Sequence, residues 1–486
     1  MQYLPLLSVI IPLIFAVLLV FCRSAQPKLQ KILVICGSLL PFMTVMAMFP
    51  SLKEGGIAGT GNAAVIFPLS FSFTADPLSI FIAAIFSVCG LIATIYSFGY
   101  INHSHAQIRY YIFMLVFQAS MLGVVLSGSL LVLFIFFELM TVSAYLLVIH
   151  EEDETAMVAG KKFLYMSLAA GLFIFLGLSI TYSLAGRLDF ISGGYIGASP
   201  LAAVALFAFL VGFGVKAGMF PLHIWLPDAH PAAPAPVSAL LSGCSIKTGI
   251  YGIIRVMHYI YELEAVRAAK LDQVLLVLAV ATILLGSALA LRQDHLKRRL
   301  AYSSVAQIGY VLLGISLLTE RAMFGALFHI FSHAVMKSAL FLCAGAIITQ
   351  TGKKYISQLA GIGYQMPVVM LSFTLASITM VGIPPFNAFI SKWHLAVASL
   401  ETGRMALVVV LIVSSLLNAL YYFPIVINAF FVKTTKSEGK KSFICDELPA
   451  GMIWTTALLA VLCVVFAFIQ PNWPVIMAGR IAASIF

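Results

Sequence analysis

The segment FGVKAGMFPLHIWLPDAHPAAPAP, residues 213–236, combines an apolar run with five prolines and one lysine. Proline removes a backbone hydrogen-bond donor and breaks a helix. The apolar windows 200–226 and 236–258 overlap the segment, so these breaks fall at membrane depth. Irregular backbone at that depth is tolerated only where it is buried in protein or lines a cavity. The segment therefore predicts a broken membrane helix inside a larger bundle, with Lys216 beside the break.

The composition of the whole chain agrees with this interpretation. The 486 residues are 62% hydrophobic and only 9% charged, with a mean hydropathy of +1.06. A soluble domain is about a quarter charged, so the chain is expected to be a polytopic membrane protein. The seven cysteines have no C-x-x-C spacing, and we interpret them as small buried hydrophobes. No glycine-rich phosphate loop follows a strand pattern. We expect no cofactor and no metal.

Apolar windows of roughly 20 residues predict an all-α protein with about fourteen membrane helices. The first window precedes the first positive residue, Arg23, and indicates a retained span rather than a cleaved signal. The windows are 4–22, 31–49, 78–98, 110–127, 129–149, 163–185, 200–226, 236–258, 273–291, 300–318, 322–349, 367–395, 405–431 and 451–469.

The distribution of Lys and Arg predicts the orientation in the membrane. Sixteen of these residues follow the odd-numbered spans and eight follow the even-numbered spans. Cytoplasmic loops carry the excess of Lys and Arg, so the odd-numbered loops are expected in the cytoplasm and both termini outside. Membrane topology thus accounts for most of the net charge of +10, and we expect no nucleic-acid partner.

Four lysines and one acid remain inside the predicted spans. They are Lys216, Lys247, Lys337, Lys392 and Glu138. Ionisable residues at membrane depth are costly and point to function. Four buried cations beside one anion cannot all be charged at once without strong repulsion, so some of the lysines must be neutral part of the time. A carboxylate about 4 Å away stabilises an ammonium by about 4 kcal/mol at an effective dielectric constant of about 20. Movement of Glu138 could therefore load or unload a lysine, as in a proton relay.

A static explanation competes with this one at some positions. Lys392 lies near a span end, where a lysine can extend its ammonium to the membrane surface. Arginine, which stays protonated, would suit a fixed charge better than lysine does. The use of lysine alone favours titration.

A second break repeats the first one. The stretch VGIPPFNAFISKWH, residues 381–394, places Pro384 and Pro385 before Lys392 inside span 12. Paired interrupted segments indicate a transporter with internal repeats. Because spans 7 and 12 are five helices apart, spans 4–8 and 9–13 are predicted to be inverted repeats. The predicted divisions are 1–109 (three helices), 110–258 (first repeat), 271–432 (second repeat) and 451–486 (a C-terminal helix).

The stretch FHIFSHAVMKSALF, residues 328–341, places His329, His333 and Lys337 four residues apart. Their side chains share one helix face and extend over about 12 Å, a distance that protons could cross with a water between each pair. The alternative is a structural polar stripe bonded to a neighbouring helix.

Polar residues also flank the first break and the fifth span. Near the break, His223, Asp228 and His230 either line an aqueous entrance or cap broken backbone. The acidic cluster Glu151–Glu154 is expected to be a solvated turn, or else to concentrate protons near an entrance.

Five segments together resemble the proton-conducting, antiporter-like membrane subunits of respiratory complex I, membrane-bound hydrogenases and Mrp cation/proton antiporters. Their order along the chain also matches that family. The segments are FFELMT (136–141), GVKAGMFPLHIWLPDAHPAAPAPVSALLSGCSIKTGIYGIIR (214–255), DHLKRRLAYSSVAQIGY (294–310), FHIFSHAVMKSALFLCAGA (328–346) and GIPPFNAFISKW (382–393).

The resemblance implies a fourteen-helix core with inverted five-helix repeats and a set of relay residues. Glu138 is expected to pair with Lys216, and Lys247 to pass protons toward the centre. His329, His333 and Lys337 would form the central bridge, and Lys392 would stand at the outward exit. The partners implied are protons, the lipid bilayer and other membrane subunits, including further antiporter-like ones, in the cell membrane of a prokaryote.

The central bridge resembles the large complex I subunit, whereas GIPPFNAFISKW looks more like Mrp D-type and hydrogenase-type subunits. The leading hypothesis is a non-catalytic proton-translocating subunit, driven by redox chemistry elsewhere in a complex. An Mrp-type Na⁺/H⁺ antiporter subunit is the alternative, although no cluster of buried carboxylates marks a sodium site. A quinone-binding redox subunit is the third. Haem ligation is disfavoured because His329 and His333 lie on one helix face.

Overall fold

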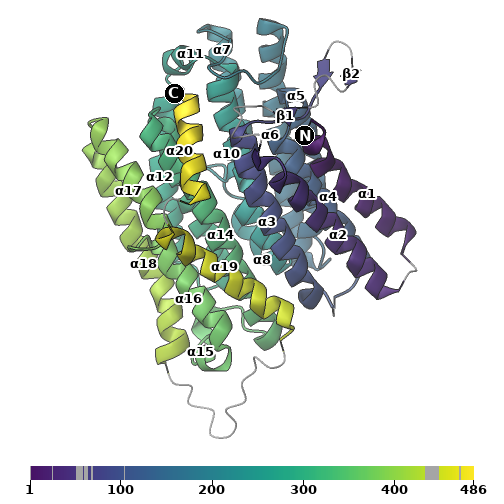
Figure 1. The fold of residues 1–486 in the computed structure, drawn as a ribbon. Helices are drawn as coiled ribbons and strands as arrows, with labels where there is room; N and C mark the ends of the chain where they lie inside the picture. The colour runs from purple at the N-terminus through teal and green to yellow at the C-terminus, as the bar shows by residue number, and fades with distance from the viewer. Residues whose placement is uncertain are drawn as a thin grey trace, which may run out of the picture.

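The computed structural model describes residues 2–23, 26–50, 58–59, 64–66, 69–102, 104–432, 448–469 and 472–486. Helices dominate it and run side by side in an elongated bundle (Figure 1). The first half of the chain forms α1 (Leu4–Phe21), α2 (Pro27–Met46), α3 (Pro77–Tyr100), α4 (Gln107–Val125), α5 (Leu130–Val148), α6 (Glu154–Ala185), α7 (Pro200–Ala217), α8 (Leu226–Ala232), α9 (Ala235–Leu240) and α10 (Ile246–Arg255).

The second half continues the bundle toward its opposite edge (Figure 1). It forms α11 (Leu263–Ala268), α12 (Leu271–Leu291), α13 (Leu296–Ser316), α14 (Glu320–Thr351), α15 (Ile362–Gln365), α16 (Pro367–Val381), α17 (Asn387–Glu401), α18 (Met405–Phe431), α19 (Ala450–Phe468) and α20 (Trp473–Ile485). The remaining elements are the π-helical turns η2 (Leu241–Ser245) and η3 (Val256–Ile260), the 3₁₀ turn η4 (Ile356–Gln358), and the antiparallel strand pairs β1 (Ala58–Gly59) with β4 (Thr74–Ala75) and β2 (Ala64–Ile66) with β3 (Leu69–Phe71).

The all-α membrane architecture is confirmed. Among the described residues, 12 helices are long and apolar enough to cross a bilayer. Helix α13 is not among them, because its first turn carries Lys297, Arg298 and Arg299. The predicted twelfth span is not among them either, because it is divided into α16 and α17. The fourteen-helix count and the inverted repeats stay predictions.

Helix α14 is the centre of the bundle. Its most apolar 18-residue window is completely buried, and it packs against α3, α9, α13, α16, α17, α19 and α20. Since His329, His333 and Lys337 lie on this helix, the fold buries all three. Only protein side chains, backbone groups or water can then satisfy them.

The first predicted break is confirmed between α7 and α8. Helix α7 ends at Ala217, and Gly218 adopts a left-handed conformation with φ +75°. Glycine suits this capping position because it has no Cβ to clash. The indole of Trp225, beyond the break, donates a hydrogen bond of 2.8 Å to the Val215 carbonyl. The last turn of α7 therefore keeps its backbone groups satisfied within the protein.

The second predicted break is confirmed between α16 and α17. Gly382 follows the end of α16 with φ +84°, and α17 begins at Asn387. A Cβ at Gly382 would lie 2.8 Å from Cδ of Lys392. Glycine is favoured here by the backbone conformation, and a larger residue would also displace the Lys392 side chain.

Several cations that the sequence places in loops are located differently. Arg255 ends α10 and is fully buried, and Lys297 and Arg299 are buried in the first turn of α13. Helix α13 begins four residues before the predicted span because Lys297 and Arg299 find acceptors inside the protein. Four other loop cations, Lys433, Lys436, Lys440 and Lys441, lie outside the described residues, as do Lys53 and Cys445.

The C-terminal segment also differs from its prediction. Residues 451–486 are predicted to hold one helix, but α19 is followed by a second helix, α20. Helix α20 packs against α14 and α3. Its 13 residues are too few to be recognised by a window of about 20.

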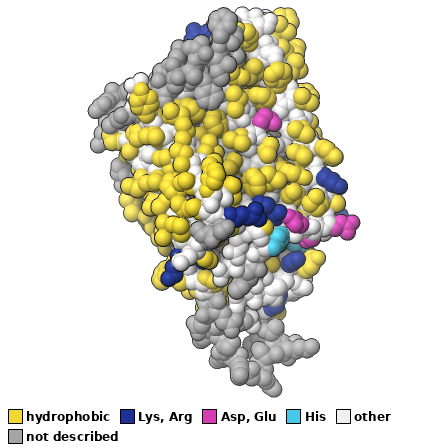
Figure 2. Space-filling view, turned by 90° about the vertical axis from the view of Figure 1, so that its right-hand side faces the viewer, with side chains coloured by type: hydrophobic (Ala, Val, Ile, Leu, Met, Phe, Trp, Pro, Cys, Tyr) yellow, Lys and Arg dark blue, Asp and Glu magenta, His cyan; other side chains and the backbone are white. Residues whose placement is uncertain are grey.

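The surface divides into an apolar region and a charged belt. Figure 2 shows a broad hydrophobic face, with lysine, arginine, acidic and histidine side chains gathered toward its lower end. The Asp153 carboxylate, in the turn before α6, caps that helix by accepting a 2.7 Å hydrogen bond from the Ala156 amide. This bond lowers the pKa of Asp153.

We expect Asp153→Ala to reduce hydrogen-exchange protection in the first turn of α6 by about 1 kcal/mol, the usual effect of losing an N-cap. Because the pKa of the folded state is depressed, the ionic contribution is present above the unfolded pKa of about 3.9 and is lost as the pH falls. Asp153→Asn should preserve the cap and lose this acid dependence. An Asn variant with the same acid-induced loss as the wild type would contradict the assignment.

Candidate functional site

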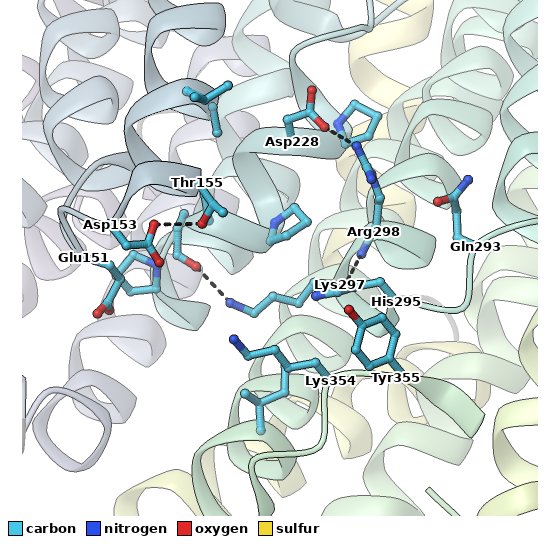
Figure 3. Close-up of a pocket in the computed structure, with 18 of the residues that line it drawn as sticks. Glu151, Asp153, Thr155, Asp228, Gln293, His295, Lys297, Arg298, Lys354 and Tyr355 are labelled. Atoms are coloured by element: carbon cyan, nitrogen blue, oxygen red, sulfur yellow. Dashed lines mark hydrogen bonds and ion pairs between the residues drawn. The ribbon is translucent and has the colours of Figure 1, made fainter. Parts of the chain in front are cut away.

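A cavity of about 1030 Å³ opens between the two halves of the chain. Glu151 and Asp153 line one side, and Lys297 and Lys354 lie across from them (Figure 3). Glu154 also lines the cavity. The cluster Glu151–Glu154 is exposed, as expected for a solvated turn, and three of its four residues also line the cavity. Together with its cationic neighbours, burial lowers the pKa of the cavity residue His295 to about 4.

Asp228 is the entrance candidate that the structure places on the cavity wall. Its carboxylate forms an ion pair with Lys162 of α6 at 2.7 Å. It forms a second one with Arg298 of α13 (Figure 3). The short helix α8 is thereby attached to both halves of the protein.

The two histidine candidates lie behind or beside the cavity. His230 on α8 is fully buried, and neither ring nitrogen has a hydrogen-bond partner among the described residues. Its ring stacks on Phe341 of α14 with centroids 4.6 Å apart. His223 lies near Phe220 and Tyr302 and does not line the cavity.

Lys297 joins the cavity to the interior and is absent from the sequence-based site. Only 5% of its surface is exposed, and its ammonium donates a 2.8 Å hydrogen bond to the Ala233 carbonyl, between α8 and α9. The Lys-Arg-Arg run resembles a membrane-boundary cluster, so hydropathy alone assigns it to a loop. Only the position of α13 beside the first break reveals its burial.

Lys337 lies in the middle of α14, and its Nζ is 6.0 Å from the centroid of the Phe341 ring. Its Nζ donates to the Leu300 carbonyl at 2.8 Å, to the Tyr422 hydroxyl at 3.1 Å and to the Ser303 hydroxyl. The two hydroxyls are also hydrogen-bonded to each other at 2.9 Å. Because a hydroxyl can donate or accept, this set of partners can serve either the ammonium or the neutral amine.

Lys247 is held by an irregularity in its own helix. Its Nζ donates a 2.5 Å hydrogen bond to the Ser242 carbonyl, within the π-helical turn η2. Short π-helical segments shift the backbone hydrogen bonds and are frequent at functional sites. Electrostatically, the fully buried His333 interacts with Lys247, Lys337 and His329. No hydrogen-bond partner for either of its ring nitrogens occurs in the described part of the chain.

His329 has partners on two other helices. Its Nε2 lies 3.0 Å from the Gln307 carboxamide oxygen, and its Nδ1 lies 2.8 Å from the Ser391 hydroxyl. That hydroxyl also donates to the Ala388 carbonyl at 2.9 Å. The doubly protonated ring can make all these bonds at once. In the neutral ring with hydrogen on Nε2, the Ser391 hydroxyl must turn toward Nδ1.

Lys392 follows Ser391 and contacts the end of the first half-helix. Its Nζ donates to the carbonyls of Met380 and Val381, at 3.1 and 2.8 Å, and to the Ser415 hydroxyl at 3.2 Å. The C-terminal carbonyls of a helix carry partial negative charge. Since this side chain is only 7% exposed and bonds inward, it does not extend to the membrane surface.

Glu138 and Lys216 have few hydrogen-bond partners for buried ionisable groups. Lys216 has only a 3.5 Å contact to the Thr141 hydroxyl and lies 4.9 Å from the centroid of the Phe163 ring. Glu138 interacts with it electrostatically without an ion pair. The Glu138 Oε1 atom is buried with no hydrogen-bond partner in the parts of the chain that the structure describes.

The structure thus brings His329, His333 and Lys337 together with Lys247 in one interior cluster and adds Lys392 through Ser391. Glu138 and Lys216 lie together on α5 and α7. The hydroxyls and amides that connect these groups are not visible in the sequence, because Ser, Tyr and Gln are common in membrane helices. The sequence-based site lacks Gln307, Ser391, Ser303, Tyr422 and Ser415.

We expect Gly382→Ala to weaken the site more than an ordinary capping change does. The backbone conformation alone costs of order 1 kcal/mol, and the new Cβ would also press on Lys392. Gly352→Ala is the matched control, since its φ is +68° and nothing lies within 4 Å of its Cβ position. The midpoint temperature of thermal unfolding of the purified protein should fall further in Gly382→Ala than in Gly352→Ala. Equal shifts would contradict the contact.

Known proteins match both the sequence and the fold. Residues 127–418 match the family described as NADH:quinone oxidoreductase/Mrp antiporter, TM. The chain is 33% identical over 475 residues to NADH-quinone oxidoreductase subunit N of Desulforudis audaxviator (strain MP104C), covering 94% of both chains.

Two solved structures have the same fold. A chain of the membrane-bound sulfane sulfur reductase, an archaeal respiratory membrane complex, superposes with a TM-score of 0.87 at 25% identity over 99% of both chains. A chain of the Mrp complex from Dietzia sp. DQ12-45-1b gives 0.88 at 23% identity, covering 100% of this chain and 97% of that one. This multi-pass membrane protein therefore belongs to the antiporter-like subunit family shared by NADH:quinone oxidoreductases and Mrp antiporters.

Proposed function

We propose that this chain is the proton-translocating subunit of a redox-driven membrane complex related to complex I or to membrane-bound hydrogenases. The observation that carries the proposal is the buried row of titratable groups running from Glu138 to Lys392 through Lys247, His333 and His329. Ionisable residues at this depth are the usual components of proton relays. The chain itself would conduct ions, and other subunits would carry out the redox chemistry.

The cavity between the halves would be the cytoplasmic entrance. The excess of Lys and Arg in the odd-numbered loops supports this orientation, which places both termini outside the cell membrane. From the cavity, protons would reach Lys297 and His230 and then Lys337, with Phe341 between His230 and Lys337 as the barrier. The two predicted repeats, 110–258 and 271–432, would each form one half of the route.

Proton movement along the row would use the hydroxyl groups and intervening water. At Lys337, rotation of the Ser303 and Tyr422 hydroxyls would accommodate either protonation state. At His329, the Ser391 hydroxyl would turn as the ring gains or loses its second proton. Ser391 precedes Lys392 in α17, so this rotation would connect the central bridge to the last lysine.

Glu138 would control the charge of Lys216 from the edge of the bundle. Its side chain is only partly buried, beside apolar residues that are 42% (Ile135), 52% (Val142) and 71% (Leu172) exposed. A partly exposed carboxylate within an apolar membrane surface is costly against lipid alone. Another membrane subunit, such as a second antiporter-like chain, would cover this face and influence the carboxylate.

An Mrp-type Na⁺/H⁺ antiporter subunit is the alternative, supported by the match to the shared family. Purification of the native complex distinguishes the two. We expect redox subunits to co-purify and proton pumping in liposomes to need no sodium. Co-purification of membrane antiporter subunits alone, with sodium-dependent proton flux, would establish the alternative. A quinone that co-purifies with this subunit would instead favour a redox role.

We expect Lys216→Met and Glu138→Gln each to reduce proton pumping at least roughly tenfold, the effect of about 1.4 kcal/mol on a rate. Each removes one partner of the pair while leaving the volume of the side chain nearly unchanged. Pumping by the assembled complex in liposomes provides the measurement, and Lys161→Met, at an exposed position of α6, serves as the control. Full pumping by Lys216→Met would eliminate its relay role.

His333→Leu should slow pumping because this ring interacts electrostatically with Lys247, Lys337 and His329. His258→Leu provides a matched control. That histidine is also buried with both nitrogens unpartnered in the described structure, but it lies outside the row. Equal losses in the two variants would mean that the effect comes from core packing.

A further inference from the structure

Arg255 is a buried charge that the relay does not use. It lies at the end of α10 opposite the cavity, eight residues after Lys247 and therefore about 12 Å further along the helix. Its guanidinium has no exposed surface, whereas its ion-pair partner Asp76, at 2.5 Å, is 14% exposed. The cation thus faces the interior and the anion lies between it and the surface.

A cage of polar and aromatic groups fixes this guanidinium. It donates 2.8 Å hydrogen bonds to the hydroxyls of Tyr251 and Ser79. The rings of Tyr259, Tyr251 and Phe190 lie 4.3, 4.9 and 5.1 Å from it. The groups able to titrate around it are Asp76 from α3, Tyr251 from its own helix and Tyr259 from η3.

Hydrogen-bonded loops close the same end of the bundle. The amide of Gly128 donates to the Ser72 carbonyl, and the amide of Leu130 donates to the Leu188 carbonyl. Residues 191–196 are bonded in turn to residues 258–260. A surface hollow of about 520 Å³ at this end is lined by residues 184–185, 187 and 195–199, none of which belongs to the Arg255 cage.

We propose that Arg255 is a fixed-charge seal that keeps protons of the buried row from leaving through the end of the first half opposite the cavity. Arginine stays protonated, so it can neither accept a proton from Lys247 nor release one outward. A unit positive charge about 8 Å from a passing proton, at an effective dielectric constant of about 20, slows passage roughly thirtyfold. The proposal rests on the proposed function, because a seal is needed only beside a conducting row.

The test is passive proton flux into liposomes that contain the purified complex, with an imposed pH gradient and no redox substrate. We expect Arg255→Gln to raise the leak at least about fivefold, because Asp76 offsets part of the effect of the charge. Arg299→Gln is the matched control, since Arg299 is also a buried arginine bonded to backbone carbonyls but lies at the cavity end. A wild-type leak in Arg255→Gln would overturn the proposal. This assay involves no pumping, so a failure of the proposed function would appear in the pumping experiments and not in the leak.

Asp76→Asn distinguishes a seal that depends on the positive charge from a structural latch, in which the ion pair only holds its two segments together. This variant breaks the ion pair and leaves the cation in place, so we expect its leak to stay at the wild-type level. If Asp76→Asn and Arg255→Gln leak equally, the pair is only a latch and the seal is disproved.

Arg255→Lys covers the case in which Arg255→Gln fails to assemble. A lysine keeps the cation at neutral pH but loses it as the pH rises, so its leak should increase toward alkaline pH while the wild-type leak does not. Parallel profiles for Arg255→Lys and the wild type, measured from neutral to alkaline pH, would overturn the proposal.

Discussion

The cost of placing an ammonium group at membrane depth is the constraint on which the rest of this structure depends. A buried cation needs acceptors, and a regular membrane helix has used its carbonyls in its own hydrogen bonds. This chain supplies acceptors where its helices are irregular. Lys392 bonds the end of α16, Lys297 bonds the connection between α8 and α9, and Lys247 bonds the π-helical turn η2. The breaks in the helices therefore supply the carbonyl acceptors that the buried lysines need.

The partners differ in a way that suits transfer rather than storage of charge. Lys392 has two carbonyl acceptors, whereas Lys337 has one carbonyl and two hydroxyls, which can reverse their direction. Lys216 has almost none and depends on its electrostatic interaction with Glu138. If every lysine had the same partners, no difference in environment would favour proton transfer from one lysine to the next. Arg255 contrasts with all of them, because its cage contains a counter-ion and its charge is permanent.

Much of the fold could be predicted because membrane burial makes hydropathy and proline informative. Both broken helices were predicted from proline near lysine, and the helical class from composition. Helix ends were less predictable. Lys297 and Arg299 sit in a run that looks like a loop, but acceptors on neighbouring segments draw them inside. Helix α20 was missed because it is short. Of the entrance candidates, only Asp228 lies on the cavity wall, since the turn of α8 buries His230 and directs His223 elsewhere.

The sequence by itself determined which groups could titrate inside the membrane, and that His329, His333 and Lys337 share one helix face, because helical periodicity is local. Only the tertiary structure decided what each group meets. The packing of α13 and α17 against α14 places Gln307 and Ser391 within hydrogen-bond distance of that face, and Tyr422 reaches it from α18. The fold also buries Arg255 against Asp76, 179 positions away in the sequence. Such contacts depend on how helices pack, and no pattern within one helix encodes its neighbours.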